Sequence, residues 1–192
     1  MNRKAYEQPH AVAVGLLRLF DNIIEILAAV EALECVACME HIPHQQAPFL
    51  NAAYKSLWDD LIVKTAALYD GDSFKQSPNC SINELRVLIE EDKKHTEHQK
   101  EIILATIDNL RKRYTFKEYR NKAKAHFDLE TMFDSPFSTV STDEIKELLF
   151  GLRDVVSLTF GMMFGIRMEE YPYLEKKQQY EDAILSCTNR RN

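Results

Sequence analysis

The chain has 192 residues and a formal net charge of −6, from 24 basic and 30 acidic residues. Hydrophobic residues make up 45% and charged residues 28%, an ordinary globular composition that excludes global disorder. The acidic balance excludes a protein that wraps nucleic acid through overall positive charge, so any nucleic-acid contact requires a local basic patch. Five glycines and six prolines are about half of average usage, which disfavours a turn-rich all-β fold.

Apolar residues recur every three or four positions along most of the chain, which predicts amphipathic helices rather than strands. This period predicts long or short helices at about 11–40, 48–70, 81–92, 95–113 and 142–163. Ser81 and Glu84 have the spacing of a capping box at the start of the third helix. Thr142 is predicted to cap the fifth helix.

The C-terminal residues carry few apolar side chains among many charged ones. Residues 172–192 are therefore predicted to form a tail or a marginal helix beside a core at about 10–167. The sequence shows no internal repeat, no low-complexity tract and no alternating strand pattern. It predicts one all-α domain over 1–192, a helical bundle of five or six helices.

The sequence predicts a cytoplasmic protein without a membrane anchor. The longest apolar run near the C-terminus, Val155–Ile166, holds 12 residues, too few to span a bilayer. The first residues are polar and lack the apolar stretch of a secretory signal. Together with these features, four cysteines in 192 residues suggest free thiols in a reducing compartment.

The clearest local feature is a basic segment at 111–124. Seven basic side chains lie there: Arg111, Lys112, Arg113, Lys117, Arg120, Lys122 and Lys124. Only Glu118 opposes them, so these 14 residues carry +6 and the remainder of the chain carries −12. Such a patch attracts phosphates, although the same pattern also fits the solvated face of an ordinary helix.

Arg120, Asn121 and His126 bring three chemically useful groups into this segment. Imidazole can take a proton from a ribose 2′-hydroxyl or give one to a leaving oxygen. Guanidinium matches a pair of phosphoryl oxygens, and the amide can orient a phosphate or a base edge. These parts suffice for metal-free RNA cleavage. The alternative for His126 is a packing histidine bonded to a backbone carbonyl.

The spacing of Arg120 and His126 limits how they can act together. In a continuous helix, residues six apart lie about 120° round and about 9 Å along the axis. Either the arginine uses its length, or the helix starts or bends between them, or two copies of the chain bring their segments together. The third option makes a homodimer part of the mechanism.

The pattern Arg120-Asn121 followed by Ala125-His126-Phe127-Asp128 resembles the Arg-(four to six)-His motif of HEPN domains. The order of the predicted helices, over roughly 10–167, also resembles the AbiU-type abortive-infection branch of these proteins. The resemblance implies a helical bundle that dimerises, with two motifs forming one cleft. It further implies a metal-independent endoribonuclease of phage defence or toxin–antitoxin systems, without a cofactor.

The resemblance assigns His126 as the acid/base, Arg120 as the phosphate and transition-state group, and Asn121 as a supporting polar residue. The basic patch adds four expected contacts to the RNA backbone: Arg113, Lys117, Lys122 and Lys124. Expected partners are RNA, a second copy of the chain, and an antitoxin or sensor protein. The alternatives are a non-catalytic HEPN module that binds nucleotide, RNA or a partner protein, and a bundle whose motif is accidental.

Three other patterns are interpreted as structural. A zinc site is conceivable at Cys35, Cys38, His41 and His44. Because both cysteines lie at the end of an apolar helix, we expect buried thiols and loop histidines instead, and no metal. His95 and His98 are predicted to lie on an exposed, charged helix start. Gly161 and Gly165 are interpreted as a close approach of two helices, or as a dimer contact.

Overall fold

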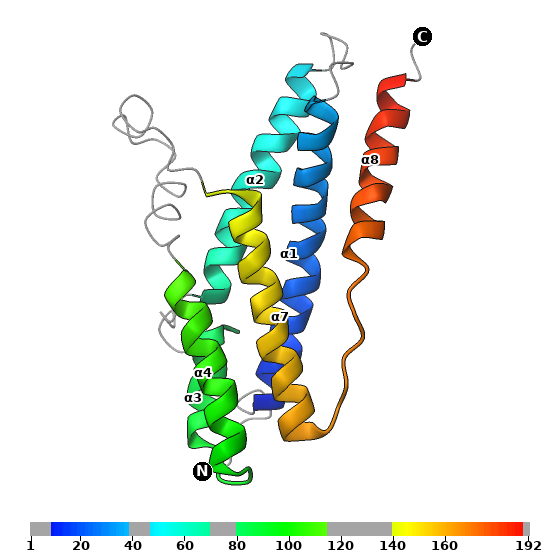
Figure 1. Ribbon diagram of the computed structural model, residues 1–192. Helices are drawn as coiled ribbons and strands as arrows, with labels where there is room; N and C mark the ends of the chain where they lie inside the picture. Colours follow the sequence, from blue (N-terminus) through cyan, green and yellow to red (C-terminus); the bar gives the residue numbers. More distant parts are fainter. Residues whose placement is uncertain (1–8, 39–46, 70–79, 115–139, 190–192) are drawn as a thin grey trace, which may run out of the picture.

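The computed structural model describes residues 9–38, 47–69, 80–114 and 140–189. Six α-helices and no strand occur in these ranges (Figure 1). They are α1 (Pro9–Cys38), α2 (Ala47–Tyr69), α3 (Ile82–Glu91), α4 (Glu97–Arg113), α7 (Thr142–Phe164) and α8 (Tyr173–Asn189). The predicted all-α helical bundle is confirmed. Within the described ranges, no helix is both long and apolar enough to cross a membrane.

The central helix of the bundle is α1, which packs against α2, α3, α7 and α8. Figure 1 shows α1 between α2 on one side and α8 on the other. Most of its predicted apolar stripe is buried, namely Leu16, Phe20, Ile23, Leu27 and Val30, but Leu19, which the period also placed there, is exposed and Leu33 is half-buried. The short α3 and the longer α4 pack on each other, and α4 also packs along α7. The core therefore lies between α1, α7 and the α3–α4 pair.

Local side chains define the starts of three helices. The Ser81 hydroxyl accepts a hydrogen bond from the Glu84 N–H, as expected from the sequence. The reciprocal bond from the Glu84 side chain, which would complete a capping box, is not among the contacts described for α3, whereas Thr96 and Gln99 form a complete capping box at the start of α4. The expectation that Thr142 caps α7 is wrong, because Ser141 holds that position and forms a capping box with Glu144. Ser141 Oγ satisfies the orphan N–H of Glu144, so Thr142 becomes the first helical residue.

The glycines of α7 have different roles. Gly165 has φ of 67° and ends the helix in the left-handed conformation, which favours glycine. Gly161 is exposed, and an added Cβ there would meet only the Ile166 carbonyl oxygen at 4.0 Å. The interpretation of this pair as a close approach of two helices within the chain is therefore wrong. The close approach on α7 occurs at Gly151, against the side chain of Leu110.

The C-terminal residues 173–189 form a helix of 17 residues that runs along α1. Its attachment is mostly polar. Glu25 of α1 accepts hydrogen bonds from Tyr171, just before α8, and from Tyr180 within it, at 3.0 and 2.9 Å. Lys176 of α8 forms an ion pair with the same carboxylate at 3.0 Å. Polar attachment explains why hydrophobic periodicity gives α8 only a weak signal.

Candidate functional site

Most of the predicted site residues lie in 115–139, outside the described residues. They are Lys117, Arg120, Asn121, Lys122, Lys124 and His126. Arg113 is described: it is the last residue of α4 and its side chain is exposed. We call residues 115–139 the motif segment. The structure describes the residues that flank this segment on each side. These are Tyr114 after α4 and Val140 before α7.

Tyr114 stacks on Tyr69 where the chain leaves α4. The ring centroids are 4.8 Å apart and the ring planes differ by 14°. Tyr114 also ends α4, because its backbone N–H donates to the Arg111 carbonyl oxygen at 3.2 Å. Tyr69 is the last residue of α2, so the stack joins the C-terminal ends of two helices.

Tyr69 is held from two further helices. Its hydroxyl donates to the Leu148 carbonyl oxygen of α7 at 2.8 Å, and its own carbonyl accepts from Asn83 Nδ2 of α3 at 2.8 Å. The residue is 4% exposed. Burial, with a smaller contribution from Tyr114, raises the pKa of Tyr69 well above its usual range. Burial also raises the pKa of Tyr114 to about 12. Both phenols are therefore neutral at physiological pH, and the Tyr69 hydroxyl remains a donor.

The return point of the motif segment is held by the start of α7. Thr142 Oγ1 donates to Glu34 Oε2 of α1 at 3.4 Å. The other oxygen of Glu34 accepts from the Tyr54 hydroxyl of α2 at 2.8 Å. The beginning of α7 is thus tied to α1 and α2 as well as capped by Ser141. Both ends of the segment that carries Arg120 and His126 are anchored to the bundle.

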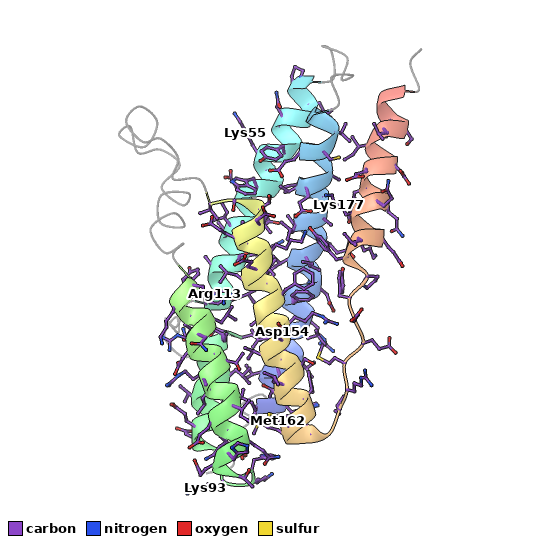
Figure 2. All side chains as sticks on the ribbon, in the orientation of Figure 1. Lys55, Lys93, Arg113, Asp154, Met162 and Lys177 are labelled. Atoms are coloured by element: carbon purple, nitrogen blue, oxygen red, sulfur yellow. The ribbon has the colours of Figure 1, made fainter. Side chains whose placement is uncertain are left out.

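Three exposed cations, Arg111, Lys112 and Arg113, fill the last turn of α4 beside Tyr114. Figure 2 shows Arg113 at this end of the helix, far from Lys93 at the other. Cations at a helix C-terminus are favoured by the helix dipole, which gives them a structural role as well. Arg111 lies 3.9 Å from Asp108 Oδ1, a long and exposed ion pair, and all three cations remain accessible to a phosphate. The described part of the basic patch is therefore accessible on the side where the motif segment departs.

The alternative metal site is only partly described. Cys35 lies in α1, whereas the Cys38 side chain, His41 and His44 lie outside the described residues. No group of three or more His, Cys, Asp or Glu side chains that could hold a metal occurs in the described ranges. His98 is exposed, as expected. The expectation of an exposed His95 is wrong, because its ring lies between Asp92 and the end of α7.

Sequence reasoning also missed the Tyr69–Tyr114 stack. The helical period placed an apolar Tyr114 in line with Leu110, but it gave no partner for the ring. Tyr69 lies 45 residues earlier in the chain, and only the tertiary fold brings the two rings together.

The chain matches the model of the HEPN_AbiU2 family, described as AbiU2, over residues 15–183. This match covers most of the chain and extends from α1 into α8, beyond the 10–167 expected from the sequence. The chain therefore belongs to the HEPN_AbiU2 family. No curated protein and no solved structure matches it.

Proposed function

We propose that this protein is a metal-independent endoribonuclease that acts in the cytoplasm, in phage defence or as a toxin. The observation that carries the proposal is the Arg120…His126 motif, which falls inside the range matched by the HEPN_AbiU2 family. The +6 charge of residues 111–124 in an acidic protein supports RNA as the substrate. The proposal includes a homodimer in which two motifs share one cleft, and an antitoxin or sensor protein as a further partner.

The proposed reaction needs only the groups of the motif. His126 takes the proton of a ribose 2′-hydroxyl, and the 2′-oxygen attacks the adjacent phosphorus. The bond from phosphorus to the 5′-oxygen breaks, and that oxygen receives a proton from a histidine. Arg120 stabilises the charge that develops on the phosphoryl oxygens, and Asn121 orients the group. The products are a 2′,3′-cyclic phosphate and a 5′-hydroxyl, so no water, metal or redox partner is consumed.

The test is cleavage of end-labelled RNA in EDTA by the wild type, His126→Ala and Arg120→Ala. The matched control is His98→Ala, which removes an exposed imidazole from α4. We expect the wild type and the control to produce 2′,3′-cyclic phosphate ends, and the two motif variants to lose more than about 100-fold in rate. Equal cleavage by His126→Ala would refute the mechanism. RNA binding without cleavage by any form would instead support a non-catalytic binding module.

The dimer is tested on the same preparations by light scattering, with the 22.3 kDa chain as reference. Mixed dimers of the two motif variants provide a second test. If each cleft takes groups from both copies, a mixed dimer has one intact Arg120 and one intact His126 in its cleft. Mixing the two inactive variants should then partly restore cleavage. A protein that cleaves fully as a monomer would overturn the shared cleft but leave the nuclease in place.

Arg113 is proposed to contact the RNA backbone. Arg113→Gln is expected to weaken RNA binding for all sequences and to reduce the salt dependence of binding by about one counterion. Lys93→Gln makes the same charge change at the opposite end of α4, where Lys93 is also exposed (Figure 2). Equal effects of the two substitutions would mean that RNA affinity depends only on the net charge of the protein, and that Arg113 makes no specific contact with RNA.

A further inference from the structure

We propose that Tyr114 is a positioning residue: stacked on Tyr69, it fixes the end of α4, from which the chain continues to Arg120 and His126. This inference rests on the proposed nuclease function, and it assigns a role to two residues outside the motif. Neither tyrosine is proposed to touch RNA or to move a proton.

The first argument is the place of Tyr114 at the end of α4. The helix is held in the core by Ile103, Ile107 and Leu110, which are buried. Its last turn then presents three exposed cations. Tyr114 is the last described residue before the motif segment, and it packs against the core. Among the described residues, it is the last contact between the end of α4 and the core before the motif.

The second argument is how firmly Tyr69 is held. The Tyr69 ring is buried, its hydroxyl is bonded to Leu148 and its carbonyl to Asn83. A ring fixed by α2, α3 and α7 is a rigid surface for a second ring to stack on. Because Tyr114 stacks on this ring, with 4.8 Å between the centroids and 14° between the planes, it is held in place relative to α2, α3 and α7.

The third argument is that Tyr69 contacts the described structure on both sides of the motif segment. The segment departs from Tyr114, which Tyr69 contacts directly. It returns to α7, and the Tyr69 hydroxyl is bonded to that helix at Leu148, six residues after Thr142. One side chain thus sets the departure point relative to the return helix.

Positioning of this kind matters because of the short chain between the stack and the motif. Arg120 follows Tyr114 by six residues, which is at most about 20 Å of extended chain. Catalysis by oriented groups is sensitive to displacements of about 1 Å, which can cost about 100-fold in rate. A change at Tyr114 is therefore expected to reach the chemistry without removing any reacting group.

The test compares Tyr114→Leu, which removes the ring, with Tyr114→Phe, which keeps it. We expect Tyr114→Leu to lower kcat by about 10- to 100-fold. Its affinity for an uncleavable 2′-deoxy analogue should change less than about 3-fold, because the cations that bind the backbone remain. Tyr114→Phe should stay within about 2-fold of wild type, since the stacked ring is conserved.

Tyr171→Leu is the control for loss of stability alone. Tyr171 also loses an aromatic contact on substitution, with Phe20 at 5.6 Å, but it lies between α7 and α8. We expect this variant to be destabilised with kcat unchanged at a temperature where it remains folded. An equal loss of kcat in Tyr171→Leu and Tyr114→Leu, or full activity in Tyr114→Leu, would overturn the positioning role.

Amide hydrogen exchange separates this inference from the proposed function. If no form of the protein cleaves RNA, the nuclease fails, but exchange at residues 116–126 still tests the anchor. We expect these amides to exchange at least about 10-fold faster in Tyr114→Leu than in wild type and Tyr114→Phe. Identical exchange in all three forms, including complete exchange at the earliest time, would overturn the inference.

Discussion

His95 links Asp92 to the C-terminal end of α7. Its Nδ1 lies 2.8 Å from Asp92 Oδ2, and its Nε2 lies 2.8 Å from the Met163 carbonyl oxygen. The imidazole ring therefore bridges the Asp92 carboxylate and the Met163 carbonyl oxygen. Gln99 donates to the neighbouring Met162 carbonyl oxygen at 2.8 Å. The α3–α4 connection and the first turn of α4 therefore contact the last carbonyl groups of α7.

Loss of this link should destabilise the bundle. We expect His95→Ala to lower the free energy of unfolding by about 1–3 kcal/mol, because it removes the ring that bridges the Asp92 carboxylate and the Met163 carbonyl oxygen. His98→Ala, three residues on and exposed, should change it by less than about 0.5 kcal/mol. Chemical denaturation of the two variants beside wild type measures both values. Equal effects would show that the link contributes nothing to stability.

Glu31 joins three helices from a buried position. Its side chain belongs to α1, is 8% exposed, and lies 3.2 Å from Lys146 Nζ of α7 and 3.3 Å from Lys177 Nζ of α8. Glu31→Gln leaves two ammonium groups facing a neutral amide. We expect a loss of about 1–3 kcal/mol, less than for a fully buried pair because both lysines are partly exposed.

The same substitution should loosen α8 more than the rest of the bundle, because α8 depends on polar contacts with α1. Amide exchange in Tyr173–Asn189 should accelerate in Glu31→Gln, relative to exchange in α4. Glu175→Gln is the matched control, since Glu175 is an exposed carboxylate on α8 itself. Uniform acceleration in both helices would mean that Glu31 supports the bundle globally rather than the attachment of α8.

The pH dependence of stability should differ in sign for two neighbouring carboxylates of α1. Burial raises the pKa of Glu25, but hydrogen bonds from Lys176, Tyr180 and Tyr171 together lower it by more than burial raises it. The pKa of Glu25 therefore lies below its usual value. Its stabilising contribution is present at neutral pH and is lost as the pH falls through that lowered pKa. Asp21 is exposed, and partial desolvation together with the charge of Glu25, opposed by Arg153, raises its pKa above the usual value. Ionised Asp21 therefore contributes a small destabilisation that is relieved in acid.

Thermal unfolding between pH 7 and pH 3 tests this pair. Glu25→Gln should have a lower Tm than wild type at neutral pH, and the difference should shrink as the pH falls. Asp21→Asn should have a Tm equal to or above wild type at neutral pH, and should decline more steeply in acid. Parallel curves for wild type and both variants would show that neither carboxylate has a shifted pKa.

The period of apolar residues was sufficient to predict the helices of the core. Leu16, Phe20 and Ile23 of α1 are buried where the stripe places them, because one face of a helix must be removed from water. The period gave only a weak prediction for α8, because α8 is attached largely through Glu25 and Glu31 and buries few apolar side chains, Tyr173 foremost. Nor could it choose between Ser141 and Thr142 as the cap, since both side chains offer the same hydroxyl.

The candidate site divides in the same way. Arg120 and His126 could be proposed from the sequence because their chemistry and spacing are local. The partners of Tyr114 and His95 could not be found, because Tyr69 and Met163 lie 45 and 68 residues away and meet them only through packing. Spacing along the chain contains no information about such contacts. A histidine beside charged residues gives the same sequence pattern whether its ring is exposed or hydrogen-bonded to a distant helix.

Two glycines of α7 give a matched test of the packing. An added Cβ at Gly151 would lie 2.5 Å from Leu110 Cδ1, whose side chain is buried against α7. An added Cβ at Gly161 would meet nothing closer than 4.0 Å. We expect Gly161→Ala to stabilise the protein by up to about 1 kcal/mol, because alanine favours the helix more than glycine. Gly151→Ala should destabilise it by about 1–3 kcal/mol, because Leu110 must leave its position between α4 and α7.

Denaturation of both variants, with Gly151→Ala repeated in a Leu110→Ala background, measures the coupling directly. If the clash is the cause, the smaller side chain at 110 removes most of the cost of the new methyl group, and an unchanged cost would assign it to the backbone instead.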